Sequence, residues 1–237
     1  MSALKVRIKF SKNGAMKFIG HLDIMRYFQK AIRRAGIDIV YTEGFSPHMV
    51  MSFANPLGVG LTSDGEYLDI EIHTPISSRE AVERLNAVMV EGMEILSFRQ
   101  VAEGKSSNAM ALVAAADYQV AFREGYEPDR NWQAAIAGFM ARDSIKIVKK
   151  TKKKEEEIEI RPLIFEMRPE GTGAFLRVSA GSACNIKPEL VMEALASFAG
   201  FELTDFSLQI HRLEVYASDP SGKGFVSLES LGDEIEP

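Results

Sequence analysis

The spacing of apolar residues changes repeatedly between two periods along the first hundred residues, and this change constrains the fold more than any other feature. Residues 5–10 alternate lysine or arginine with apolar residues, which predicts a half-buried strand with one basic face. Residues 21–35 place apolar side chains three and four positions apart, which predicts an amphipathic helix that ends at Gly36. The apolar stripe of this helix comprises Leu22, Met25, Phe28, Ile32 and Ala35.

The same reasoning extends the pattern through residue 101. Further strands are expected at residues 37–41, 67–73 and 93–101, with a short apolar segment at 50–53 and a second helix at 78–90. The resulting order is β-α-β-β-α-β, the order of the ferredoxin-like split βαβ arrangement. This arrangement is an antiparallel sheet with two helices on one face.

The second half of the chain repeats the pattern. Strands are expected at 112–122, 145–148, 157–164, 175–179 and 206–216, and helices at 128–140 and 188–199. A run of lysines followed by glutamates at 149–157 predicts a hairpin with charge-paired arms or a mobile tip.

We therefore predict an α+β protein of two tandem ferredoxin-like units with antiparallel sheets. The first unit would cover residues 1–102 and carry the basic and histidine-bearing surface, and the second would cover 111–217. Residues 103–110 would be a linker and 218–237 an irregular tail. A single fused sheet is the alternative.

Charge is distributed unevenly along the chain. Residues 1–50 contain nine lysines and arginines against three acidic residues, a net charge of +6, whereas the remaining residues carry −11. This asymmetry favours a polyanion as the partner of the N-terminal part. No apolar run approaches the roughly 20 residues of a membrane span, and the N-terminus lacks the apolar segment of a signal peptide, so we expect a cytoplasmic protein without membrane contact.

Several residues are candidates for nucleic-acid contact. The helix at 21–35 carries basic side chains opposite its apolar stripe, the first strand adds another, and a histidine follows a Pro-containing turn. The candidates are Lys9, Arg26, Lys30, Arg33, Arg34 and His48. A solvated helix face is the alternative. Tyr41 and Phe45 could stack on bases, although packing in the core is the favoured interpretation.

Catalytic and metal chemistry find little support. His21, at the start of the first helix and beside basic residues, is the one candidate acid or base. The single cysteine, Cys184, can supply neither an iron–sulfur cluster nor a thiolate zinc site, and no histidine pair has metal-ligand spacing. We expect no metal and no cofactor.

Six segments resemble a bacterial family of uncharacterised proteins described as radical-SAM-linked. They are residues 18–26 (FIGHLDIMR), 31–37 (AIRRAGI), 41–48 (YTEGFSPH), 56–60 (PLGVG), 65–71 (GEYLDIE) and 158–164 (IEIRPLI). The chain departs from the family pattern at Gly20, where serine is expected, and at Met49, where proline is expected. Both are details of a cap or turn.

The resemblance implies a partner: family members look like neighbours of, or fusions to, a separate radical SAM enzyme. The first hypothesis is therefore a protein without catalytic activity of its own, which binds or presents tRNA or rRNA to such an enzyme for modification. Phe45, Pro47 and Pro56 would dock the enzyme.

Two alternatives remain open. A weaker likeness to tandem ferredoxin-like CRISPR RNA-processing endoribonucleases favours a metal-independent nuclease that uses His21, although Gly222-Lys223-Gly224 is a poor match to their glycine-rich loop. The other alternative is a pure protein-docking module.

Overall fold

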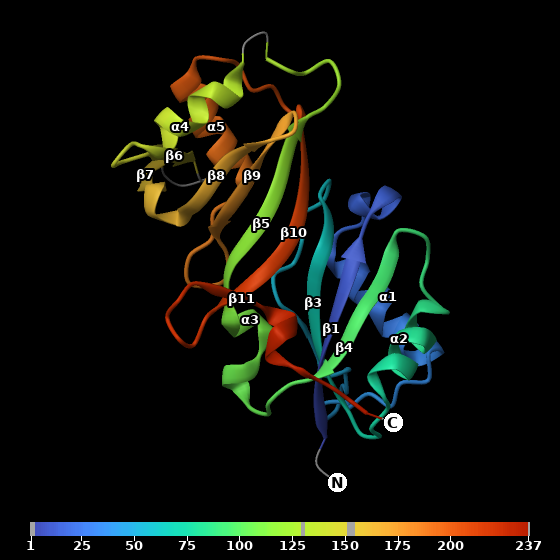
Figure 1. Ribbon diagram of the computed structural model, residues 1–237. Helices are drawn as coiled ribbons and strands as arrows, with labels where there is room; N and C mark the ends of the chain where they lie inside the picture. The colour runs from blue at the N-terminus through green and yellow to red at the C-terminus, as the bar shows by residue number, and fades with distance from the viewer. Residues whose placement is uncertain (1–2, 129–130, 151–154, 237) are drawn as a thin grey trace. The chain divides into compact units, whose positions relative to one another are not determined.

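A computed structural model describes residues 3–128, 131–150 and 155–236 of the chain (Figure 1). The fold is α+β, with a large, mostly antiparallel sheet and few helices. The chain forms two compact units. The first consists of Met1–Ala114 and Glu214–Pro237, and the second of Ala115–Leu213.

The first unit begins with the predicted alternation of strands and helices. Its main elements are β1 (Leu4–Lys12), α1 (His21–Arg34), β2 (Met51–Phe53), β3 (Thr62–Ile72), α2 (Ser78–Asn86), β4 (Met93–Gln100) and α3 (Ala109–Leu112). The strands are ordered β4-β1-β3, and β2 also pairs with β3. All these pairs are antiparallel.

Helices α1 and α2 lie on one face of this sheet and form the core with it (Figure 1). Even-numbered residues of β1 and β3 point to this face, as the period of two requires. The most deeply buried members of the core are Val6, Ile8, Phe28, Ile32, Leu68, Ile72, Ala81, Leu85 and Phe98.

The prediction for α1 is confirmed except at one position. Asp23 lies in its first turn and Arg33 and Arg34 in its last, where each charge suits the helix dipole. Gly36 follows the helix with a φ of 67°, a conformation that glycine adopts without strain. The predicted stripe is wrong at Leu22, which is exposed, because Ile24 takes the buried position one turn before Phe28.

Residues 37–41 do not form the predicted strand. Ile37 and Ile39 are buried alternately, but only two isolated bridges form in this region, Ile39 with Ile72 and Tyr41 with Met49. Alternating apolar residues indicate that one side of an extended segment is buried. Here that side is buried although the segment does not form a continuous hydrogen-bonded ladder with a neighbouring strand. In this region β2, in the short apolar segment, has a continuous register along β3, and Ile39 adds one isolated bridge to the end of β3.

In its described residues the second unit includes six strands and two α-helices. They are β5 (Val113–Phe122), α4 (Ala135–Met140), β6 (Lys146–Lys150), β7 (Glu155–Glu159), β8 (Ile164–Glu170), β9 (Gly173–Ser179), α5 (Pro188–Ala199) and β10 (Leu208–Ser218). The strand order is β10-β5-β9-β8. The chain passes between the two units within β5 and β10. The prediction for α5 is confirmed at both ends, with Pro188 in its first turn and Gly200 after its last residue.

The predicted charged hairpin is confirmed in its described part. β6 and β7 form a separate two-stranded antiparallel sheet, in which Lys149 lies opposite Glu156 and Lys150 opposite Glu155. Lys146 Nζ is 2.7 Å from Glu157 Oε2. The tip of the hairpin, residues 151–154, lies outside the described residues.

The expectation of an irregular tail is wrong for the described residues 218–236. They form β11 (Phe225–Ser227), a short 3-10 helix (Leu228–Leu231) and β12 (Asp233–Glu234). β12 pairs with β4, and the Ser78 backbone N–H donates to the Ile235 carbonyl at 3.0 Å. The C-terminal residues are thus an integral part of the first unit.

The segment 103–110, predicted as a linker, packs on the face of the sheet opposite the helices. The Lys5 ammonium donates to the Gly104 carbonyl at 3.1 Å, to Ser107 Oγ at 2.9 Å and to Asn108 Oδ1. Burial lowers the pKa of Lys5 from its ordinary value, and the charge of Asp69 partly offsets this effect.

Candidate functional site

The helix α1 presents a basic face to solvent. The basic face comprises Arg26, Lys30, Arg33 and Arg34, all of them exposed, while Ile24, Phe28 and Ile32 are buried on the other side. Arg26 is partly neutralised by Asp23, one turn earlier, with 3.1 Å between Nη1 and Oδ1. Within the described residues neither Lys30 nor Arg34 forms an ion pair, so their charges remain available to an anionic partner.

A structured turn lies beside the C-terminal end of the basic face. The turn comprises residues 41–49 and is closed by the bridge between Tyr41 and Met49. The Thr42 backbone N–H donates to the His48 carbonyl at 2.9 Å, and the His48 N–H donates to Thr42 Oγ1 at 3.1 Å. Arg33 Nε donates to Tyr41 Oη at 3.4 Å, which links the turn to the helix.

Two aromatic residues of the 41–49 turn face solvent. Phe45 is 111% exposed and Tyr41 is 41% exposed, so the favoured prediction that both pack in the core is wrong. Local geometry explains the difference. Gly44 has a φ of 108° and Pro47 follows two residues after Phe45, so the chain reverses direction and leaves the Phe45 ring beyond the body of the unit.

Lys9 does not belong to this surface. Its ammonium lies 2.7 Å from Glu214 Oε2 and 3.1 Å from Glu229 Oε2 and is mostly buried. Burial alone would lower the pKa of Lys9, but the hydrogen bonds and charges of the two carboxylates raise it. Burial and the charge of Glu214, which accepts a 2.7 Å hydrogen bond from the Tyr67 hydroxyl, likewise raise the pKa of Tyr67.

The prediction of a basic, half-exposed face on the first strand is therefore wrong. Arg7, at 2% exposure, donates to Asp69 through Nε at 2.8 Å and through Nη2 at 3.1 Å. The same guanidinium donates to the carbonyls of Ser107 at 2.8 Å and Leu228 at 3.1 Å. Asp69 also accepts the Ala109 backbone N–H at 2.7 Å. These cations hold segments of the first unit together and are shielded from solvent.

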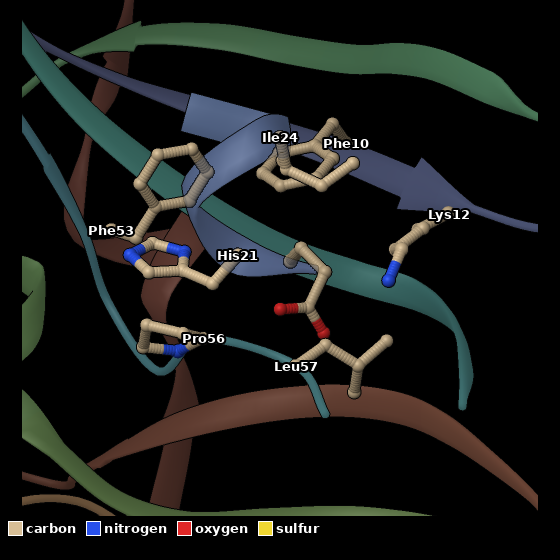
Figure 2. Close-up of a pocket in the computed structure, with 8 residues that line it drawn as sticks. Phe10, Lys12, His21, Ile24, Phe53, Pro56 and Leu57 are labelled. Atoms are coloured by element: carbon tan, nitrogen blue, oxygen red, sulfur yellow. The ribbon is translucent and has the colours of Figure 1, made fainter. Parts of the chain in front are cut away.

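His21 lies at the mouth of a small pocket at the start of α1 (Figure 2). The imidazole lies between Phe53 and Pro56, and its ring meets that of Phe53 edge to face with 5.0 Å between centroids. Lys12 points into the pocket from β1 and donates to the Ile19 carbonyl at 2.9 Å. The remaining lining residues are Phe10, Ile24, Leu57 and Glu66.

The pocket offers limited chemistry to a substrate. Lys12 and Glu66 also line it but are 2% and 4% exposed, so His21 is the one titratable lining residue with substantial access to solvent. Among the described residues, no group of three or more histidine, cysteine, aspartate or glutamate side chains is placed to hold a metal ion. The pocket therefore supplies one candidate acid or base, His21. Its other titratable lining residues are buried.

We expect His21 to titrate below the usual histidine pKa of 6.5, because partial burial disfavours the imidazolium ion. The unfolded chain then binds the proton more tightly, so His21 lowers the unfolding free energy as the pH falls below about 6.5 and has no such effect at higher pH. NMR titration of the Hε1 resonance, assigned with a His21→Gln variant, measures this pKa. A value of 6.5 or above would contradict the expectation.

Apolar side chains are exposed around the pocket. Phe18, Leu22 and Val59 are 66%, 63% and 62% exposed. The Gly60 N–H donates to the Lys17 carbonyl at 2.7 Å, which ties the loop of Val59 to the segment of Phe18. We call Phe18, Leu22 and Val59 the apolar rim. The apolar rim could not be predicted from helical spacing, which places Leu22 in the apolar stripe that packs on the core.

The three predicted docking residues are all exposed but belong to different elements. Phe45 and Pro47 are in the 41–49 turn, at one end of α1, and Pro56 lines the pocket at the other end. A helix of 14 residues is roughly 20 Å long, so the two ends of α1 present separate surfaces, one basic and aromatic and the other apolar.

Comparison with known proteins places the chain in a family. None of the helices in the described residues combines the length and apolar character needed to span a membrane. A comparison with curated proteins found no match to the sequence. Residues 5–188 match a family model described as "Uncharacterized protein conserved in bacteria (DUF2344)". The match covers more than half of the chain, and it confirms the resemblance to an uncharacterised bacterial family. The protein therefore belongs to the DUF2344 family of bacterial proteins.

Proposed function

We propose that this protein is an accessory RNA-binding protein that presents tRNA or rRNA to a separate radical SAM enzyme in the cytoplasm. The observation that carries the RNA-binding part is the exposed basic face of α1 beside a turn with exposed aromatic residues. Arginine and lysine contact phosphates, while aromatic rings and histidine offer contacts to bases.

The connection to a radical SAM enzyme comes from the family resemblance and agrees with the composition. A [4Fe–4S] cluster is held by several cysteine thiolates, and this chain has one cysteine. The cluster would therefore belong to the partner. The apolar rim and Pro56 supply a surface for that partner at the opposite end of α1 from the RNA.

The strand order supports a ferredoxin-like fold for both units. The order is β4-β1-β3-β2 in the first unit and, with the separate β6-β7 hairpin set aside, β10-β5-β9-β8 in the second. Each order places the last strand beside the first and the third beside the second. We propose on this basis that the chain contains two tandem ferredoxin-like units. Such folds host many functions, so the functional proposal rests on the surface of α1.

We expect the purified protein to bind labelled bulk tRNA with an affinity that falls as the salt concentration rises, because phosphate contacts release counterions. Addition of the proposed radical SAM partner should give a ternary complex. Fluorescence anisotropy at two salt concentrations measures the first result, and size-exclusion chromatography the second.

The same samples distinguish the alternatives. Intact tRNA after incubation supports a presenting role, whereas cleavage that disappears in His21→Ala would favour the endoribonuclease. A complex with the enzyme but without tRNA affinity would indicate a docking module and would contradict the proposal.

A further inference from the structure

We infer that the 41–49 turn binds an unpaired nucleotide by stacking its base on Phe45, so that the RNA held at this site is single-stranded. This inference rests on the proposed function, because it names the form of RNA that the basic face of α1 would hold. The inference concerns the contact of Phe45 with the nucleobase, whereas the basic face of α1 would contact the phosphates.

The Phe45 ring is fully exposed to solvent. At 111% exposure it has no cover from the rest of the unit. A phenyl ring has no polar atom that could form hydrogen bonds with water. It is therefore available for contact with another flat apolar surface. Base–aromatic stacking is such a contact, and it tolerates any base because every base has a π face.

The turn that carries Phe45 is closed by backbone and side-chain hydrogen bonds. The bridge between Tyr41 and Met49 and the hydrogen bonds between Thr42 and His48 close its base. In addition, His48 Nδ1 lies 3.1 Å from Thr42 Oγ1. A ring held on a closed turn loses little conformational freedom when a ligand binds, and this favours affinity.

Positive and negative side chains lie at different places around the turn. Arg33 lies against Tyr41 at the base of the turn, and Arg34 is exposed next to it in the helix. Glu43, also exposed, lies two residues before Phe45 and would repel a phosphate at the tip. Phosphates are therefore favoured beside Arg33 and Arg34, where the turn meets the helix. The uncharged nucleobase is favoured at the tip of the turn, beside Phe45.

This arrangement suits a single strand better than a duplex. In an A-form helix the bases are stacked on one another and the major groove is too narrow for side chains to reach them. An unpaired nucleotide can offer a free face to Phe45 while its neighbouring phosphates lie near Arg33 and Arg34.

The test compares a labelled single-stranded RNA with the same strand in a blunt duplex. We expect the wild-type protein to prefer the single strand, and Phe45→Ala to weaken single-strand binding by roughly 5- to 150-fold, the range for loss of one base–aromatic stack. Phe45→Tyr should restore most of the affinity, because it retains the ring. Phe165→Ala, which removes an exposed ring in β8 of the second unit, is the matched control and should have no effect.

The outcomes separate this inference from the proposed function. Salt-sensitive binding of both RNAs with equal affinity, unaffected by Phe45→Ala, would overturn the inference and leave RNA binding intact. No binding of any RNA would overturn both. Loss of the complex with the radical SAM enzyme in Phe45→Ala, with unchanged RNA affinity, would make the turn a protein contact and overturn the inference as well.

Discussion

Replacement of Asp69 by alanine is expected to destabilise the first unit by roughly 3–5 kcal/mol, the cost of removing one partner from a buried ion pair. The change leaves the Arg7 guanidinium, at 2% exposure, without its counter-charge. It also removes the acceptor of the Ala109 backbone N–H. Because whole domains are stable by only about 5–15 kcal/mol, this loss is a large fraction of the total.

The second unit offers a matched control for Asp69→Ala. Asp117 pairs with Arg177 through two hydrogen bonds of 2.7 Å, but the Arg177 side chain is 30% exposed. Water can hydrate this guanidinium after Asp117→Ala, so the loss should be clearly smaller. The double variant Arg7→Met/Asp69→Leu should recover part of the stability, since it leaves no unpaired buried charge.

Urea unfolding followed by circular dichroism measures these effects. Trp132, the only tryptophan, lies in the second unit, so its fluorescence reports that unit. Asp69→Ala should shift the dichroism transition more than the fluorescence transition if the units unfold separately. A loss of less than about 1 kcal/mol for Asp69→Ala would mean that water reaches Arg7 and would contradict the buried pair.

Local features allowed much of the helical structure to be predicted from the sequence. α1 and α5 combine an apolar stripe with end signals, Gly36 and Pro188, that depend on only a few neighbouring residues. The strands β1 and β3 follow from alternation in the same way. The strand predicted at residues 37–41 failed because alternate burial does not itself require a pairing ladder.

The long-range contacts could not be predicted in this way. Lys9 appeared available for RNA because its partners, Glu214 and Glu229, lie more than 200 residues away in the sequence. Nothing local to Lys9 indicates that the C-terminal residues fold back on the first unit. A charge count by segment therefore overestimated the basic surface, and only the part on α1 is exposed.

Only the part of the candidate site that depends on local spacing could be predicted from the sequence. Arg26, Lys30, Arg33 and Arg34 are placed on the solvent side of α1 by the helical period alone. The exposure of Phe45 was missed because an aromatic residue is more often buried than exposed, and only the geometry of the turn reverses that expectation.

Charge reversal at the C-terminal end of the basic face is expected to weaken RNA binding strongly. In Arg33→Glu/Arg34→Glu, two cations that would contact phosphates become two anions that repel them. We expect the affinity for tRNA to fall by roughly 10- to 100-fold at low salt. The slope of log affinity against log salt concentration should also become less steep by about two, because about two fewer counterions are released.

A matched variant on α2 tests whether the effect is local. Arg79→Glu/Arg84→Glu makes the same change in net charge on exposed residues of the same unit, where the arginines pair with Glu83 and Glu80. This variant should retain nearly all of the RNA affinity. Because Arg33 and Arg34 also suit the dipole of α1, circular dichroism must show that both variants remain folded. An equal loss in the two variants would show that net charge alone attracts RNA, and no loss in either would remove α1 from the RNA site.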